Sequence, residues 1–267
     1  MSDAELNKTL EKLSSISLCA KRDPAFEFLS LAHHLNVVLL KDCYNRLARN
    51  KAVGVDGVNW KEYGANLDDN LETLVTKLKK GSYKPLPARR VYIPKGDNAV
   101  RPLGISAIEN KIVESGLARI MGNIYENDFM EFSYGFRAKR NAHQALKVIG
   151  DSINFKPVNH IVEADIKGFF DNVEHDLLME FIQIRIKDSS LLFLIDLFLK
   201  AGYIDDSQLI TTEKGTPQGS ILSPMLANIF LHYVLDKWFD DKVQNHTNGY
   251  VEIVRYADDF ICLVQTQ

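Results

Sequence analysis

The sequence predicts an α+β fold in which an antiparallel sheet is backed by helices. Three observations support this. Apolar residues recur at helical spacing in the first third of the chain, and a proline-rich stretch with a turn sequence follows them. Near the end, two apolar strand-like stretches are joined by a tight turn. The chain has 267 residues, of which 46% are hydrophobic, so it is long enough to bury a large core.

The first half of the chain is expected to be mainly helical, with one hairpin. Val37, Leu40 and Tyr44 recur at helical spacing until the sequence GVDG interrupts them. Ser106 and Glu109 have the spacing of a capping box, which predicts the start of a helix of about 20 residues. The other expected elements are a helix at 67–80, a hairpin formed by 89–95 and 99–105, and a helix at about 140–150.

The second half begins with a short strand of alternating apolar residues, Ile161 to Ile166, which is expected to be buried and to carry Asp165 at its end. The two apolar strands at the end of the chain meet at Ala257–Asp258. Between the Asp165 strand and this terminal hairpin we expect two helices at about 175–187 and 190–200, a hairpin near 203–212, and a long helix after the turn GTPQG.

Charge and cysteine content narrow the class of protein. The net charge is −3, yet the segment from Lys77 to Arg101 has eight basic residues and one acidic residue, a local charge of +7. This segment is either a solvated basic face or a contact for an anionic partner. Three cysteines without close pairing, a polar N-terminus and no apolar run of membrane-spanning length predict a cytoplasmic protein with reduced thiols and no membrane partner.

Asp258 and Asp259 are adjacent carboxylates inside an apolar hairpin, where burying charge is costly. Successive strand side chains point to opposite faces, so the turn brings one carboxylate in fully and the other partly. If the strand that carries Asp165 pairs beside this hairpin, three carboxylates meet and repel one another. Such a cluster suits bound cations, and hard carboxylate oxygens suit Mg²⁺.

Several stretches together resemble the reverse transcriptases, specifically the group II intron-encoded reverse transcriptase/maturase type. The stretches DIKGFFDNVEHD, GTPQGSILSPMLANIFL and VRYADDFICL are similar to the family's palm motifs. GVDGV, ARRVYIPKGDNAVRPLGI and FSYGFRAKRNAHQAL are similar to its finger motifs. The resemblance implies a right-hand polymerase fold with fingers and palm, and an RNA-directed DNA polymerase that adds dNTPs to a primer 3′-hydroxyl.

The resemblance also implies roles for single residues. Asp165 and Asp258 are expected to be the main ligands of two Mg²⁺ ions, which Mn²⁺ could replace, with Asp259 a looser third ligand and the carbonyl of Ile166 a further one. Phe170 is expected to exclude the 2′-hydroxyl of an rNTP. Phe169 beside it has the pattern of a core aromatic, and it is also placed, with Ile166, among the expected nucleotide contacts. The remaining expected nucleotide contacts are Lys95 and Arg101 on the triphosphate, and Gln218 and Gly219 near the sugar.

The basic segment is expected to contact template phosphates through a set of lysines and arginines, namely Lys77, Lys79, Lys80, Lys84, Arg89 and Arg90. The expected partners are an RNA template (intron RNA), a DNA or RNA primer and dNTPs. A homodimer is compatible with the sequence.

The chain stops soon after the last strand, so a thumb is expected to be absent and processive synthesis by this chain alone to be weak. The expected division is an N-terminal extension with fingers (1–105), a first palm part (106–173), a fingers insertion (174–218) and a second palm part (219–267). Two alternatives stay open at this point: an RNA-binding maturase that assists splicing, and a domesticated reverse transcriptase in host defence.

Overall fold

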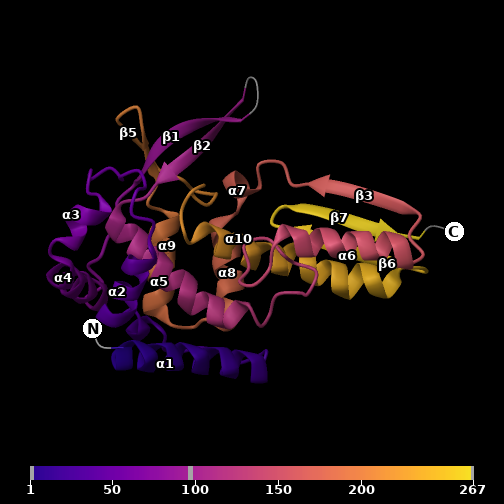
Figure 1. The fold of residues 1–267 in the computed structure, drawn as a ribbon, viewed down its shortest axis with the longest axis horizontal. Coiled ribbons are helices and arrows are strands. Elements are labelled where there is room, and N and C mark those ends of the chain that lie inside the picture. The colour runs from indigo at the N-terminus through magenta and orange to yellow at the C-terminus, as the bar shows by residue number, and fades with distance from the viewer. Residues whose placement is uncertain (1–2, 96–98, 266–267) are drawn as a thin grey trace.

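A buried helix, α5 (Ile108–Tyr125), lies at the centre of the helical body of the protein (Figure 1). The computed structural model describes residues 3–95 and 99–265. Helices α1 (Asp3–Arg22) and α2 (Val37–Arg46) pack against α5, and α4 (Leu67–Lys79) packs against α2. The helix expected from the spacing of Val37, Leu40 and Tyr44 and the helix expected at 67–80 are therefore confirmed. The short helices α3 (Trp60–Gly64) and η1 (Ala32–His34) complete this part.

The capping box predicted at the start of α5 is wrong. Ala107 is the N-cap residue, and no side chain caps the helix. The Ser106 hydroxyl instead donates to Glu114 Oε1 at 3.0 Å, and Glu109 accepts from Lys77 Nζ at 3.4 Å. Glu114 is only 2% exposed. A carboxylate this deeply buried is costly without hydrogen-bond donors, so the Ser106 hydroxyl serves Glu114 and does not cap the helix.

A first sheet projects from the helical body, with strand order β2-β1-β4-β5 (Figure 1). Strands β1 (Ala88–Lys95) and β2 (Ala99–Ile105) form the first predicted hairpin, whose turn at 96–98 lies outside the described residues. The second predicted hairpin is also confirmed. It consists of β4 (Tyr203–Asp205) and β5 (Gln208–Ile210), and β4 pairs in parallel with β1.

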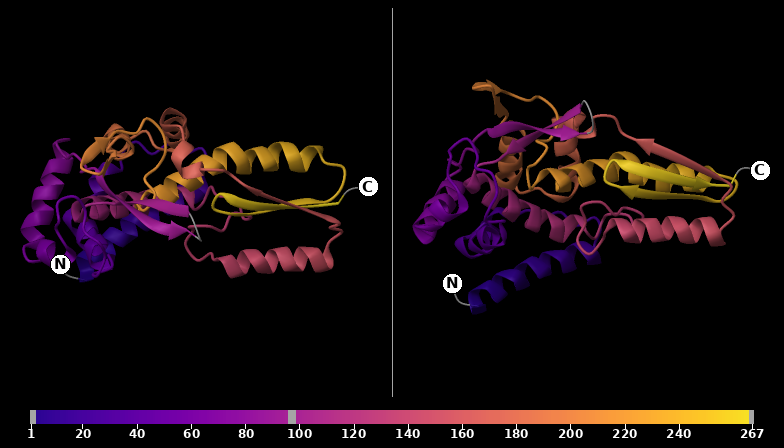
Figure 2. Two further views of the ribbon diagram at one scale, coloured as in Figure 1. Left: turned by 90° about the horizontal axis from the view of Figure 1, so that it is seen from above. Right: turned by 45° about the horizontal axis from the view of Figure 1, so that its top comes forward.

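The second sheet is antiparallel, with strand order β3-β7-β6. It contains β3 (His160–Asp165), β6 (Val251–Tyr256) and β7 (Asp259–Val264). Figure 2 shows α6 (Ala142–Phe155) and the long helical segment that begins with α10 (Ser223–Leu231) running alongside this sheet. The segment continues as the π-helical stretches η2 (His232–Asp236) and η3 (Phe239–Gln244), and both α6 and η3 contact β6. The predicted helix-backed antiparallel sheet is thus confirmed.

The strand that carries Asp165 is not buried as predicted. Ile161 and Val162 in β3 are 52% and 53% exposed. β3 is an edge strand that pairs only with β7, whereas α6 packs against β6 and β7. The alternation of apolar residues therefore predicts the strand correctly but not its burial. The short α7 (Phe169–Asn172) follows it, and then α8 (His175–Arg185) and α9 (Ser189–Leu199) return the chain to the helical body.

No helix within 3–95 or 99–265 is both long and apolar enough to cross a membrane.

His232 makes the fold sensitive to acid. Its ring packs edge-on against Phe129 (centroids 5.8 Å apart), and burial, followed by the charge of Lys237, lowers the pKa of His232 from 6.5 to about 3. Below pH 6.5 the unfolded chain takes up a proton here that the folded chain does not, so stability falls as the pH drops toward 3. We expect this histidine alone to cost about 2 kcal/mol by pH 5.

Urea unfolding at pH 7.5 and pH 5.0 tests this. The variant His232→Phe should lose about 2 kcal/mol less between the two pH values than the wild type. The exposed His246 offers a control, because His246→Phe should leave the pH dependence as it is. Equal losses in wild type and His232→Phe would rule out this role.

Candidate active site

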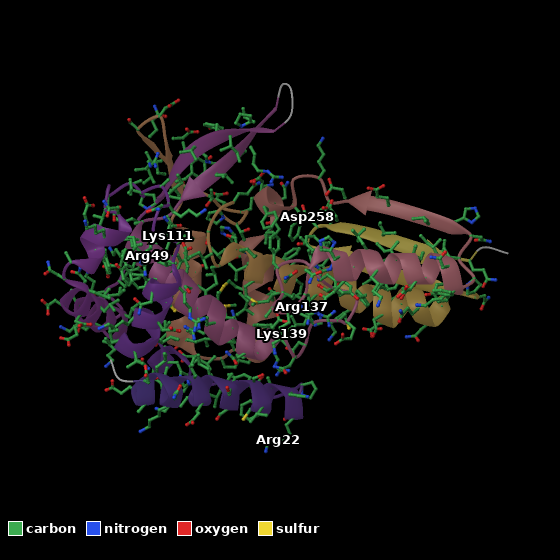
Figure 3. All side chains as sticks on the ribbon, viewed as in Figure 1. Arg22, Arg49, Lys111, Arg137, Lys139 and Asp258 are labelled. Carbon is green, nitrogen blue, oxygen red and sulfur yellow. The ribbon has the colours of Figure 1, made fainter. Side chains whose placement is uncertain are left out.

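Three carboxylates meet where the second sheet faces the helical body. The register of β3 and β7 places Asp165 directly opposite Asp259. Asp258 sits in the turn between β6 and β7, after Ala257, whose φ of +58° is left-handed (Figure 3). Asp258 is half-buried, whereas Asp165 and Asp259 are exposed. The meeting of the three residues predicted from the sequence is therefore present, and it comes from strands about 95 residues apart in the chain.

The electrostatics of this cluster favour a bound cation. Burial raises the pKa of Asp259, and the nearby Asp258 and Asp165 carboxylates raise it further. A cation would relieve this repulsion, and an all-carboxylate donor set suits a hard ion such as Mg²⁺. In the part of the chain that the structure describes, no group of three or more His, Cys, Asp or Glu side chains is arranged to hold one ion together.

The carboxylates line a cavity of about 640 Å³ between the second sheet, α7 and strand β2. The cavity also collects most of the nucleotide contacts expected from the sequence, namely Arg101, Ile166, Phe169, Phe170, Gln218 and Gly219. The side chain of Lys95 lies outside what the structure describes. The structure therefore brings together side chains from four separate stretches of the chain.

Phe169 and Phe170 are adjacent but differ in surroundings. Phe169 is 6% exposed, and its ring packs against Phe230 with centroids 6.0 Å apart, as expected of a core aromatic. Phe170 is half-buried at the cavity wall. Its ring meets Phe169 edge-on at 5.5 Å and Phe136 edge-on at 6.4 Å. Phe136 is a cavity residue that the sequence reasoning missed.

The turn that carries Gln218 and Gly219 is held from two sides. The Gln218 carbonyl accepts a hydrogen bond from the Gly104 amide at 2.6 Å, and the Ile221 amide donates to Glu114 Oε2 at 2.8 Å. Burial raises the pKa of Glu114, and the bonds from Ile221 and Ser106 oppose that shift. Glu114 was not among the residues predicted from the sequence, because a single Glu in a helix pattern gives no sign of burial.

Gly219 must be glycine for two physical reasons. Its φ of +105° is unfavourable for other residues, and a Cβ there would lie 2.6 Å from the Gly104 carbonyl oxygen. We expect Gly219→Ala to cost about 1–3 kcal/mol of stability and to push the Gln218 turn away from β2. Thermal unfolding measures the loss, and Gly150→Ala, in open space on α6, is the matched control that should be neutral or stabilising. Equal stability of the two variants would contradict the argument.

A buried ion pair lies directly behind the Asp258 turn. The Arg255 guanidinium donates to Asp236 through Nε (2.7 Å) and Nη2 (2.5 Å), and both side chains are fully buried. Arg255 Nη1 also donates to the Ala257 carbonyl at 2.9 Å and to Asn228 Oδ1 at 3.1 Å. Arg255 therefore ties the residue before Asp258 to the helical segment behind the sheet. An arginine inside an apolar strand was the sequence signal for this pair.

The basic residues expected to contact a template divide into two groups. Lys79, Lys80 and Lys84 are exposed. The others have partners within the protein: Lys77 pairs with Glu109, Arg89 donates twice to the Val53 carbonyl (3.1 and 2.8 Å), and the Arg90 guanidinium lies 3.6 Å from the centre of the Tyr203 ring. Arg89 thus holds the fold locally in addition to any contact with a partner.

Comparison with known proteins gives a consistent result. The family model described as reverse transcriptase (RNA-dependent DNA polymerase) matches residues 93–267. The chain is 35% identical to "Protein YkfC" of Escherichia coli K12, over 79% of this chain and 63% of that protein. It is 41% identical to "Group II intron-encoded protein LtrA" of Lactococcus lactis subsp. cremoris, over 73% of this chain and 32% of that protein. The expected resemblance to group II intron-encoded proteins is confirmed.

The fold also has a solved counterpart. A chain of the structure titled "Partial Cas6-RT-Cas1--Cas2 complex" superposes with a TM-score of 0.52 at 21% identity, covering 87% of this chain and 38% of that one. This likeness shows the fold, and it agrees with the fingers and palm expected from the motifs. Family match, fold and the placement of the three aspartates point the same way. The chain belongs to the reverse transcriptase (RNA-dependent DNA polymerase) family.

Proposed function

We propose that this chain carries the catalytic centre of an RNA-directed DNA polymerase that adds dNTPs to a primer on an RNA template. The observation that supports this most directly is the cluster of Asp165, Asp258 and Asp259 at the wall of a cavity that also holds Phe170 and Gln218. In this reaction a primer 3′-oxygen forms a bond to the α-phosphorus of the dNTP, and diphosphate leaves.

Asp165 and Asp258, with Asp259 and the Ile166 carbonyl beside them, would hold two Mg²⁺ ions. If bound there, the ions would supply positive charge against the negative charge that develops on the attacking and leaving oxygens. Mn²⁺ has a similar preference for oxygen ligands, so it is proposed to substitute. By fixing where the ions would bind, the carboxylates would determine where the reacting phosphate is held, and phosphoryl transfer depends on this positioning.

The remaining cavity residues position the nucleotide. Arg101, exposed on β2 at the cavity, suits phosphate oxygens through its planar fork, and Lys95 lies on the same hairpin. The Phe170 ring, at the cavity wall, is proposed to pack under the sugar and to leave no room for a 2′-hydroxyl. Gly219 lets the backbone come close to the nucleotide. The exposed Lys79, Lys80 and Lys84 are proposed to contact template phosphates.

Primer extension on an RNA template with Mg²⁺ tests the proposal, using the longest natural protein that contains this sequence. dNTPs and rNTPs are compared, and Phe170→Ala is included. DNA synthesis with poor use of rNTPs, and improved rNTP use in Phe170→Ala, would support it. Absence of synthesis from a folded protein that binds the primer–template would refute it.

A second candidate is an RNA-binding maturase, favoured by the exposed lysines and by the likeness to a group II intron-encoded protein. On this view RNA binding depends on Lys79, Lys80 and Lys84 and not on the carboxylates. A cytoplasmic location is proposed for either activity, and the three free cysteines fit it. RNA binding that survives Asp258→Asn but falls with salt and with lysine replacement is the expected signature.

A further inference from the structure

The connection between α5 and α6 touches the active site at two successive residues. A Cβ on Gly135 would lie 2.2 Å from the Ala257 amide nitrogen, so the loop backbone packs directly on the turn that carries Asp258. The next residue, Phe136, lines the cavity and places its ring edge-on against Phe170 at 6.4 Å, with an interplanar angle of 80°. This loop is therefore in contact with both the carboxylate turn and the aromatic wall.

Phe136 is held in this place at a conformational cost. Its φ of +57° is left-handed, which is unfavourable for a residue with a bulky side chain. Its neighbour Arg137 fixes the loop by donating to the carbonyls of Met130 (2.7 Å) and Ser133 (2.9 Å) and to Glu126 Oε2 (3.1 Å). The Arg137 side chain is only 3% exposed. The loop is anchored by Arg137 and Gly135, so the Phe136 ring is not needed to hold it.

Phe136 is 53% exposed, although phenylalanine is usually buried. The Phe170 ring contacts two others, the buried Phe169 and the exposed Phe136. Both of these neighbours line the cavity, but Phe169 is fixed in the core, whereas Phe136 belongs to the loop. If the Phe136 ring is removed, Phe170 loses one of its two ring contacts and gains space to leave its position at the cavity wall.

We propose that Phe136 is a specificity-determining residue, which supports Phe170 in the position that excludes the 2′-hydroxyl of an rNTP. This inference rests on the proposed function. On this view the choice between dNTP and rNTP depends on two rings, Phe170 on α7 and Phe136 on the loop between α5 and α6. It also explains why a strained and exposed aromatic residue faces the cavity.

The test measures binding without chemistry. The longest natural protein that contains this sequence is bound to a primer–template whose primer ends in a dideoxynucleotide, and the Kd values of dATP and ATP are compared. Phe136→Ala is expected to reduce the preference for dATP about three- to tenfold, mainly through tighter ATP binding. Phe136→Tyr, which keeps the edge-on ring, should retain the preference. Phe155→Ala, which removes an exposed ring far along α6, is the matched control and should leave it unchanged.

The variant Phe170→Ala shows whether Phe136 affects the dATP preference through Phe170 or independently of it. In the Phe170→Ala background, Phe136→Ala should reduce the preference no further, because the residue it supports is already gone. Additive effects, or an unchanged preference in Phe136→Ala beside a selective wild type, would overturn the inference while leaving the polymerase proposal in place. A wild-type complex that binds neither nucleotide would overturn both.

Discussion

Replacing Asp258 with asparagine should abolish detectable DNA synthesis while leaving the protein folded. Asparagine has almost the same shape as aspartate but lacks the negative charge that a metal ion requires. Loss of a metal ligand removes several kcal/mol of transition-state stabilisation, so kcat should fall about 10³-fold or more. Because Asp258 also repels Asp259, its removal takes away one cause of the raised pKa of Asp259 and should not destabilise the fold.

Single-nucleotide incorporation on an RNA template measures this effect, with thermal unfolding as the check on folding. The exposed Asp241 provides a control of the same chemical change, since Asp241→Asn lies on η3 and outside the cavity. Asp258→Asn with kcat within tenfold of the wild type would mean that this carboxylate does not hold a catalytic ion.

The second large effect is on stability. Asp236→Ala should destabilise the protein by about 3–5 kcal/mol, because it leaves the Arg255 guanidinium buried with its main partner gone. Arg255 would keep only its bonds to Asn228 and to the Ala257 carbonyl. The turn that carries Asp258 should therefore loosen in any molecule that still folds, with a further loss of kcat.

Urea unfolding gives the free energy of unfolding for this variant. The matched control is Glu131→Ala, which breaks an ion pair with Arg140 in which the Glu131 side chain is 92% exposed. That variant should lose less than about 1 kcal/mol. A similar small loss in Asp236→Ala would show that the buried pair does not stabilise the fold.

Much of the fold and of the carboxylate cluster is predictable from the sequence, because both depend on local patterns. Apolar spacing and turn residues predict the helices and the strands of the three hairpins, β1–β2, β4–β5 and β6–β7. The position of Asp165 at a strand end and of Asp258 in a turn follows from the same patterns. Their meeting then requires only that the two strands pair, which the register of Asp165 opposite Asp259 shows.

The features that sequence reasoning missed depend on contacts between distant residues. β3 has the alternation of a buried strand, but its exposure is set by which elements pack on it. The Ser106 hydroxyl donates to Glu114, eight positions further along the chain, and so does not cap the helix. Phe136 meets Phe170 across 34 positions, and nothing in either local pattern indicates that contact.

The ion pair of Arg255 and Asp236 also has a consequence for evolution. Replacing either residue alone leaves an unpaired charge in the interior, so a single substitution at either position destabilises the fold. Relatives should therefore keep both residues or replace both, and the two columns of an alignment should covary even though they are 19 positions apart. The two positions would thus be constrained as a pair, although both side chains are fully buried.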